Sequence, residues 1–171
     1  SDGVVTVTMN RPEKKNAANS VMWDELLATF REIRDSETDR VLVLTGAGGA
    51  FCSGADLSDP AALTTNGVTR MRHIGDVALA LHHIPKPTIA KVGGVAAGAG
   101  CNMALGCDLV VASDEARFSE IFSKRGLALD FGGSYVLPRL IGMHKAKELA
   151  FFADVISAKE AEAFGIVNRV V

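Results

Sequence analysis

Two apolar strand-like segments of this sequence each run into a turn built mostly of small residues. The first reads LVLTGAGGAFCSGADL and the second IAKVGGVAAGAGCNMAL, and Gly and Ala fill most of the stretch 93–108. A turn without bulky side chains lets a ligand approach the backbone closely. Where it opens a helix, unpaired N–H groups point outward, and two of them converging on one oxygen would form an oxyanion hole. Tight packing of helix on strand explains Gly98, Gly100 and Gly106 equally well.

Strand-like and helix-like patterns alternate along the chain. Alternating or β-branched runs predict strands over 4–10, 40–46, 88–93, 108–113 and 166–171. Helical periodicity predicts helices over 21–36, 70–84, 133–141 and 143–153, with Ser20 capping the first and Ser157 capping a further one. The polar stretch 58–69 is expected to form a loop that acts as a lid. This order predicts one α/β domain, residues 1–171, with largely parallel strands.

The composition excludes several classes of function. The chain has 171 residues, a net charge of −2 and only 6% aromatic residues, so neither charge nor stacking favours a nucleic acid or a membrane surface as partner. Cys52, Cys101 and Cys107 match neither a disulfide framework nor a zinc pattern, and the four histidines lack zincin spacing. We therefore expect no metal, three small buried cysteines and a cytoplasmic location.

Several motifs in the same order along nearly the whole chain resemble the crotonase superfamily, the enoyl-CoA hydratase/isomerase enzymes. They are NRPEKKNA, AFCSGADL, KPTIAKVGGVAAGAGCNMALGCDLVVAS, the GGSYVLPRLIG segment and ISAKEAEAFGIVNRVV. The resemblance implies a spiral of repeated ββα units, assembled as a homotrimer or a dimer of trimers. It also implies further C-terminal helices, so the chain is expected to be truncated at both ends.

The resemblance implies acyl-CoA thioesters as substrates and no separate cofactor, since coenzyme A belongs to the substrate. The two backbone N–H groups that receive the thioester oxygen would be those of Ala55, after the Gly of SGAD, and Ala99, where relatives mostly have Gly. Residues similar to those that hold coenzyme A in the family are Lys15, Ala17, Ser53, Asp56 and Leu57.

The acid positions depart from the hydratase pattern. The two Glu residues that hold a water in the hydratases correspond to Asn102 and Phe122, neither of which does acid–base work, so both are expected only to line the pocket. Asp130, in GLALDFGG, matches the single aspartate of the isomerase-like branch, and its apolar neighbours would raise its pKa. The alternative role for Asp130 is to cap the helix beginning near Gly133. Glu120 is a further candidate acid, for which a salt bridge to Arg117 or Lys124 is the simpler role.

These residues favour double-bond isomerisation of an enoyl-CoA, with Asp130 moving one proton along the acyl chain. Three alternatives stay open. Hydration would use Asp130 or Glu120 in place of the lost acids. Hydrolysis or dehalogenation would use Asp130 as nucleophile, and an acyl-CoA-binding subunit would bind thioesters without turnover.

Overall fold

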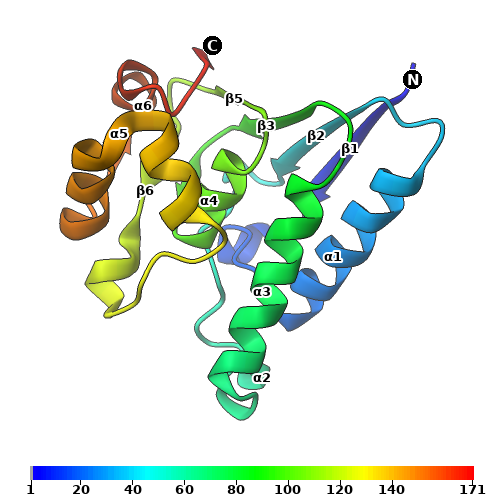
Figure 1. Ribbon diagram of the computed structural model, residues 1–171, viewed down its shortest axis with the longest axis horizontal. Coiled ribbons are helices and arrows are strands. Elements are labelled where there is room, and N and C mark those ends of the chain that lie inside the picture. Colours follow the sequence, from blue (N-terminus) through cyan, green and yellow to red (C-terminus); the bar gives the residue numbers. More distant parts are fainter. Residues whose placement is uncertain (1) are drawn as a thin grey trace.

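The computed structural model describes residues 2–171, apart from the side chains of residues 62 and 63. The described residues form eight strands interspersed with helices, and five of the strands are those that the sequence predicts (Figure 1). The strands are β1 (Val4–Met9), β2 (Val41–Gly46), β3 (Thr88–Val92), β4 (Val95–Ala97), β5 (Leu109–Ala112), β6 (Arg117–Ser119), β7 (Ile156–Ser157) and β8 (Arg169–Val170). The helices are α1 (Ser20–Asp35), α2 (Pro60–Thr64), α3 (Gly67–His82), α4 (Ala99–Leu105), α5 (Gly133–Phe152) and α6 (Ala158–Phe164), with 3-10 turns η1 (Pro12–Lys14) and η2 (Ile121–Arg125).

The strands form two sheets. The larger has the order β1-β2-β3-β5-β8 and is parallel throughout, and the smaller has the order β4-β6-β7, with β4 and β6 parallel and β6 and β7 antiparallel. Two isolated parallel bridges, Cys52 to Ala96 and Ala18 to Ala55, extend the smaller sheet toward the N-terminal part of the chain. Each turn of the chain thus gives one strand to the large sheet, one short extended segment to the small sheet, and then a helix. The ββα spiral expected from the sequence is confirmed.

Helices pack on the large sheet, whose two edge strands are β1 and β8 (Figure 1). Helix α1 buries one face against the sheet and against α3, because its apolar residues recur at helical spacing. The buried residues of α1 are Met22, Trp23, Leu26, Phe30 and Ile33. The three cysteines are buried and free, as predicted.

Three local predictions need correction. The cap of α1 is Asn19, whose side chain accepts a hydrogen bond from the Met22 amide, and not Ser20. The stretch 58–69 is not a plain loop, since Asp59 caps α2 and Asn66 caps α3 within it. The short strands β4, β6 and β7 were not predicted, because two or three residues give little periodicity. The predicted break between helices 133–141 and 143–153 is confirmed as a kink in α5, where Gly142 has φ 76° and ψ 158°.

The prediction of a capped helix after Ser157 is also confirmed. The Ser157 side chain accepts from the Glu160 amide, and the Glu160 carboxylate accepts from the Ser157 amide at 2.8 Å. Within residues 2–171 no helix is both long and apolar enough to cross a membrane.

The Gly/Ala-rich stretch forms β4 and the buried helix α4, which lies in the middle of the molecule (Figure 1). A side chain on Gly100 would place its Cβ 2.2 Å from the Cys52 carbonyl oxygen. A side chain on Gly94 would also collide with the backbone, because the atom nearest to its Cβ would be the Gly49 carbonyl oxygen. The glycines therefore let successive turns of the spiral pack backbone against backbone.

Gly100→Ala is expected to destabilise the protein by about 3 kcal/mol, because the Cys52 backbone has to move to admit a methyl group. Gly75→Ala is the matched control. Gly75 lies inside α3 with no atom near its Cβ position, so alanine should stabilise the helix by about 0.5–1 kcal/mol. Urea unfolding of both variants checks this, and equal stabilities would contradict the packing account.

Candidate active site

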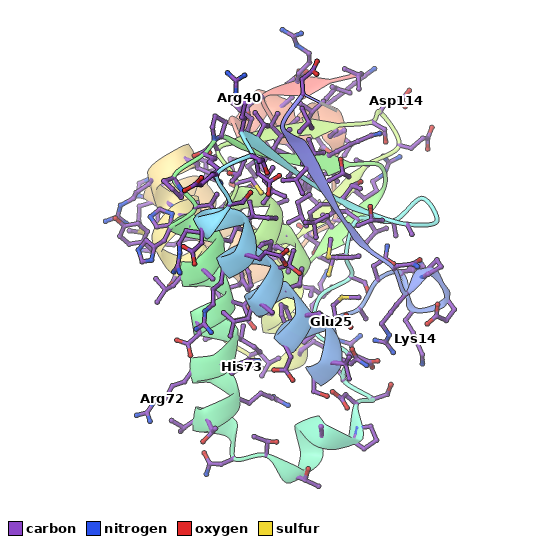
Figure 2. All side chains as sticks on the ribbon, turned by 90° about the vertical axis from the view of Figure 1, so that its right-hand side faces the viewer. Lys14, Glu25, Arg40, Arg72, His73 and Asp114 are labelled. Carbon is purple, nitrogen blue, oxygen red and sulfur yellow. The ribbon has the colours of Figure 1, made fainter. Side chains whose placement is uncertain are left out.

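A cavity of about 600 Å³ lies between α1, α3, the segment after the first Gly-rich turn and the loop before α5. Its walls are largely apolar, with Trp23, Leu57 and Leu129 among them. At one side His73 of α3 reaches Asp24 of α1, with Nε2 2.9 Å from Oδ1, and Figure 2 shows His73 at the junction of the two helices. The complete lining is Ala18, Ser20, Trp23, Asp24, Ala55, Asp56, Leu57, Asp59, Ala61, Thr65, Gly67, Thr69, Arg70, Met71, His73, Ile74, Leu127, Ala128, Leu129 and Asp130.

Asp130 lines this cavity from a loop with an uncommon backbone conformation. The next two residues, Phe131 and Gly132, have φ 47° and 79°, and the left-handed region is unfavourable for a phenylalanine. The buried Phe131 ring packs against Trp23 at 5.9 Å between centroids, which anchors the loop to α1. The loop therefore holds a fixed course that presents Asp130 to the cavity.

Asp130 does not cap α5, so that alternative is wrong. The N-cap of α5 is Gly132, without a side-chain hydrogen bond, and the Gly133 amide donates to the Asp130 backbone carbonyl. The Asp130 Oδ1 atom is buried and has no hydrogen-bond partner among the described residues. Burial raises the pKa of Asp130 to about 6, against the opposing effect of the Arg70 guanidinium.

The other three carboxylates of the cavity wall are engaged. Asp24 pairs with His73, and Asp59 accepts from the amides of Ser20 and Ala61. Asp56 accepts from Ser58 and lies 3.0 Å from Arg11, and these interactions, those of Ser58 first, lower its pKa to about 2. Within the described part of the cavity, Asp130 is thus the carboxylate with an oxygen left for a ligand and a raised pKa.

The amides of Ala55 and Ala99 come from neighbouring segments. Ala18 bridges to Ala55 by donating to the Gly54 carbonyl and accepting from the Asp56 amide, which leaves the Ala55 N–H on the opposite side. Ala99 is the first residue of α4. A Cβ on Gly54 would lie 3.6 Å from the Ala99 nitrogen. Among the described residues, neither amide donates a hydrogen bond. Ala55 lines the cavity, whereas Ala99 is almost fully buried just behind it.

Asn102 and Phe122 do not line this cavity, contrary to the prediction. Asn102 is buried behind the Asp130 loop, and its Nδ2 donates to the Asp130 carbonyl oxygen at 3.1 Å. The buried Phe122 ring lies against Gly98, with its Cζ 3.8 Å from the position that a Cβ would take there. Both residues thus support the backbone around the cavity.

The predicted salt bridge of Glu120 is also wrong. The Arg117 guanidinium donates to the carbonyls of Asp114 and Ala116, and Lys124 pairs with Asp154. Glu120 is instead buried between α4 and the strand β6 that precedes it, where burial raises its pKa to about 7.

The residues predicted to hold coenzyme A fall into two groups. Asp56 and Leu57 line the cavity, and Leu57 is more than half exposed. Lys15, Ala17 and Ser53 lie outside its lining, at the contact between η1 and the first Gly-rich turn, where the Ser53 amide donates to the Lys15 carbonyl at 3.0 Å. This contact lies beside the exposed Lys14 labelled in Figure 2.

Sequence reasoning missed Trp23, Arg70 and His73. Trp23 is one of several apolar residues on the inner face of α1, and nothing in the pattern separates it from the rest of the core. Arg70 and His73 belong to the polar part of α3, where most charged residues face solvent. Only the distance between α1 and α3 reveals that these side chains meet a cavity.

A ββα spiral with a Gly-rich helix start at an apolar cavity defines a crotonase-type fold. The sequence profile of the enoyl-CoA hydratase/isomerase family matches residues 1–171. The chain is 44% identical over 168 residues to a probable enoyl-CoA hydratase of Rhodobacter capsulatus, covering 98% of this chain and 65% of that protein. It is 41% identical over 174 residues to the 1,2-epoxyphenylacetyl-CoA isomerase of Escherichia coli, covering 99% and 66%.

Solved structures agree with these sequence matches. A putative enoyl-CoA hydratase from Streptomyces coelicolor A3(2) superposes with a TM-score of 0.94 at 37% identity, over 100% of this chain and 64% of that one. The chain thus spans about two thirds of the length of these relatives, and it belongs to the enoyl-CoA hydratase/isomerase family.

Proposed function

We propose that the chain forms the acyl-CoA-binding core of an enzyme that moves a double bond along an enoyl-CoA. One observation carries the proposal: the cavity that Ala55 lines also holds a partly desolvated carboxylate, Asp130, with an unpartnered oxygen. At the two positions where the hydratase pattern has glutamates, this chain has Asn102 and Phe122. A single carboxylate is sufficient to shuttle a proton, whereas adding water requires a second group to orient it.

In the proposed reaction the thioester oxygen accepts hydrogen bonds from the Ala55 and Ala99 amides. These bonds polarise the carbonyl and acidify the carbon next to it and, through a double bond, the γ-carbon. Asp130 takes one such proton, and the electron pair of the C–H bond moves into a dienolate. Asp130 then returns the proton at the other end of the dienolate, which leaves the double bond shifted and the carboxylate regenerated.

The same proposal covers the binding of coenzyme A, the oligomeric state of the enzyme and its cellular location. Lys15, Ala17 and Ser53 would hold the nucleotide end, and Asp56 and Leu57 the pantetheine arm next to the cavity. Coenzyme A arrives as part of the substrate, so no separate cofactor is required. Among the described residues no group of three or more His, Cys, Asp or Glu side chains is placed to hold a metal ion. A homotrimer or dimer of trimers in the cytoplasm completes the proposal.

The experiment supplies a 3-enoyl-CoA and a 2-enoyl-CoA separately to the full-length protein in D₂O. We expect the two isomers to interconvert, with deuterium entering the acyl chain at the α- and γ-carbons. Formation of 3-hydroxyacyl-CoA without double-bond migration would overturn the isomerase proposal.

A specific observation keeps hydration as the second candidate. Glu120 is a second buried carboxyl group close to the site, and its interaction with Asp130 contributes to its raised pKa. Two carboxyl groups with separated environments are what hydration needs. In that case Glu120→Gln would abolish hydration and leave double-bond migration intact.

A further inference from the structure

Two buried polar side chains lie behind the Asp130 loop. They are Glu120, at the start of η2, and Asn102, inside α4, and the partly buried Asp130 lies close enough to Glu120 to affect its charge. Both carboxyl oxygens of Glu120 and the side-chain oxygen of Asn102 are buried, and within the described residues none has a hydrogen-bond partner. Such a set of acceptors is costly, and the Cys101 thiol beside Glu120 is only a weak donor, so the cluster needs a stronger one.

Asn102 is the structural link to the catalytic loop. Its Nδ2 donates to the Asp130 carbonyl at 3.1 Å, and the Gly133 amide donates to the same carbonyl at 2.9 Å. The Asn102 amide packs so closely on Gly133 that a Cβ there would lie 2.3 Å from Nδ2. A rotation of the Asn102 amide would replace this donor by an oxygen facing the Asp130 carbonyl. The orientation of Asn102 therefore decides whether the loop is held.

Glu120 is the group able to fix that orientation. Burial, with a smaller contribution from the charge of Asp130, raises its pKa to about 7 even though interactions with Cys101 and Asn102 favour the ionised form. On the other side of Glu120 lies a cavity of only about 10 Å³, next to Leu149 and Asp154, which is room for one water at most. Below its pKa the Glu120 carboxyl carries a proton that it can donate.

We propose that Glu120 is a positioning residue whose protonated carboxyl group donates a hydrogen bond to the Asn102 side-chain oxygen and thereby fixes the Asp130 loop. The inference rests on the proposed function, in which Asp130 is the acid/base. Glu120 touches no reacting atom. It acts through Asn102 on the course of the backbone that carries Asp130.

The test compares Glu120→Gln with Glu120→Leu in the full-length protein. Glutamine keeps a donor for Asn102, so its rate at pH 6.5 should stay within about threefold of wild type. Leucine removes the donor, and a displaced loop should lower kcat by about 10- to 100-fold with KM nearly unchanged. Glu115→Gln, an exposed carboxylate a few residues earlier, is the matched control and should change neither quantity.

The pH dependence separates the proposal from a merely structural role. The ionisable groups that face Glu120 are Cys101, Asp130 and Asp154, the last paired with Lys124. As wild type loses the Glu120 proton above about pH 7, its kcat should fall, whereas Glu120→Gln should keep its rate. A wild-type plateau to pH 9, or a glutamine variant impaired at every pH, would overturn the proposal.

A second readout needs no substrate. Because the folded-state pKa of Glu120 is raised, its contribution to stability is full below its ordinary value of 4.5 and is lost as the pH rises through about 7. Glu120→Gln should therefore raise the Tm relative to wild type at pH 8 and not at pH 4.5. The raised pKa of Asp130 changes the stability in a lower pH range, up to about pH 6, and does so equally in wild type and in Glu120→Gln.

An unchanged Tm difference between the two pH values would contradict the inference even if Asp130 proves catalytic. A failure of Asp130→Asn to slow proton exchange would instead contradict the proposed function and leave this readout valid.

Discussion

Asp130→Asn is expected to slow deuterium exchange into an enoyl-CoA by about 10²–10⁴-fold. The amide has nearly the same shape but accepts no proton, and the loop should keep its course because Phe131 and Asn102 hold the backbone and not the carboxylate. KM should therefore change little. The measurement is the rate of deuterium entry from D₂O, followed by mass spectrometry of the acyl chain.

The pH profile of the wild-type enzyme tests the same assignment. Asp130 acts as a base only when it is ionised, and burial raises its pKa to about 6. The exchange rate should therefore rise as the pH passes through about 6, below the range above about pH 7 in which loss of the Glu120 proton lowers it, and the residual rate of Asp130→Asn should lack this rise. A rise centred near pH 4 would mean that the carboxylate is solvated in the working enzyme.

Asp24→Asn is the control for a charge change in the same cavity. Asp24 lines the cavity, is largely exposed and pairs with His73, so its loss should alter the exchange rate by less than about threefold. If Asp24→Asn and Asp130→Asn slow exchange to the same extent, the effect is a general electrostatic one and Asp130 is not the base.

The sequence predicts all five strands of the large sheet, because each lies in an alternating or β-branched run, and the alternation with helices predicts their parallel pairing but not their order. It predicts the segments of the small sheet poorly, since β4, β7 and the bridges at Ala18 and Cys52 are only one to three residues long. Those short pairings fix the course of the backbone at Ala55 and just before Ala99. The architecture is thus set by periodicity, whereas the geometry of the site depends on contacts that leave no periodic signal.

The two candidate acids, Asp130 and Glu120, differ in the same way, since the sequence predicts the surroundings of the first better than those of the second. A motif position singled out Asp130, and its raised pKa has the direction expected from its apolar sequence neighbours, although of these only Phe131 is buried. The surroundings of Glu120 could not be inferred in this way. Its sequence neighbours Arg117 and Lys124 favour a surface ion pair, but Glu120 directly follows the buried residues Phe118 and Ser119 and is itself buried near Cys101 and Asn102 of α4. Only the tertiary structure shows which groups surround it.

Ala99→Pro is expected to lower kcat by about 10²–10³-fold, the effect of removing one donor from an oxyanion hole. Ala99 is the first residue of α4, where proline fits the helix geometry and where the amide has no partner among the described residues. The substitution therefore deletes the N–H that the proposed reaction uses and leaves the hydrogen bonds of the helix intact. Because Ala99 is almost fully buried, the extra ring atoms should also lower the Tm, so kcat is measured at a temperature at which the variant is fully folded.

Ala99→Gly is the matched control, because it changes the side chain at the same position and keeps the N–H. We expect its kcat to remain within a few fold of wild type. The proline ring also fills space beside the amide, so steric exclusion of the thioester is the competing explanation. Exclusion would raise KM and leave kcat unchanged, whereas loss of a donor to the dienolate lowers kcat itself. A proline variant with full kcat would show that the Ala99 amide does not stabilise the transition state.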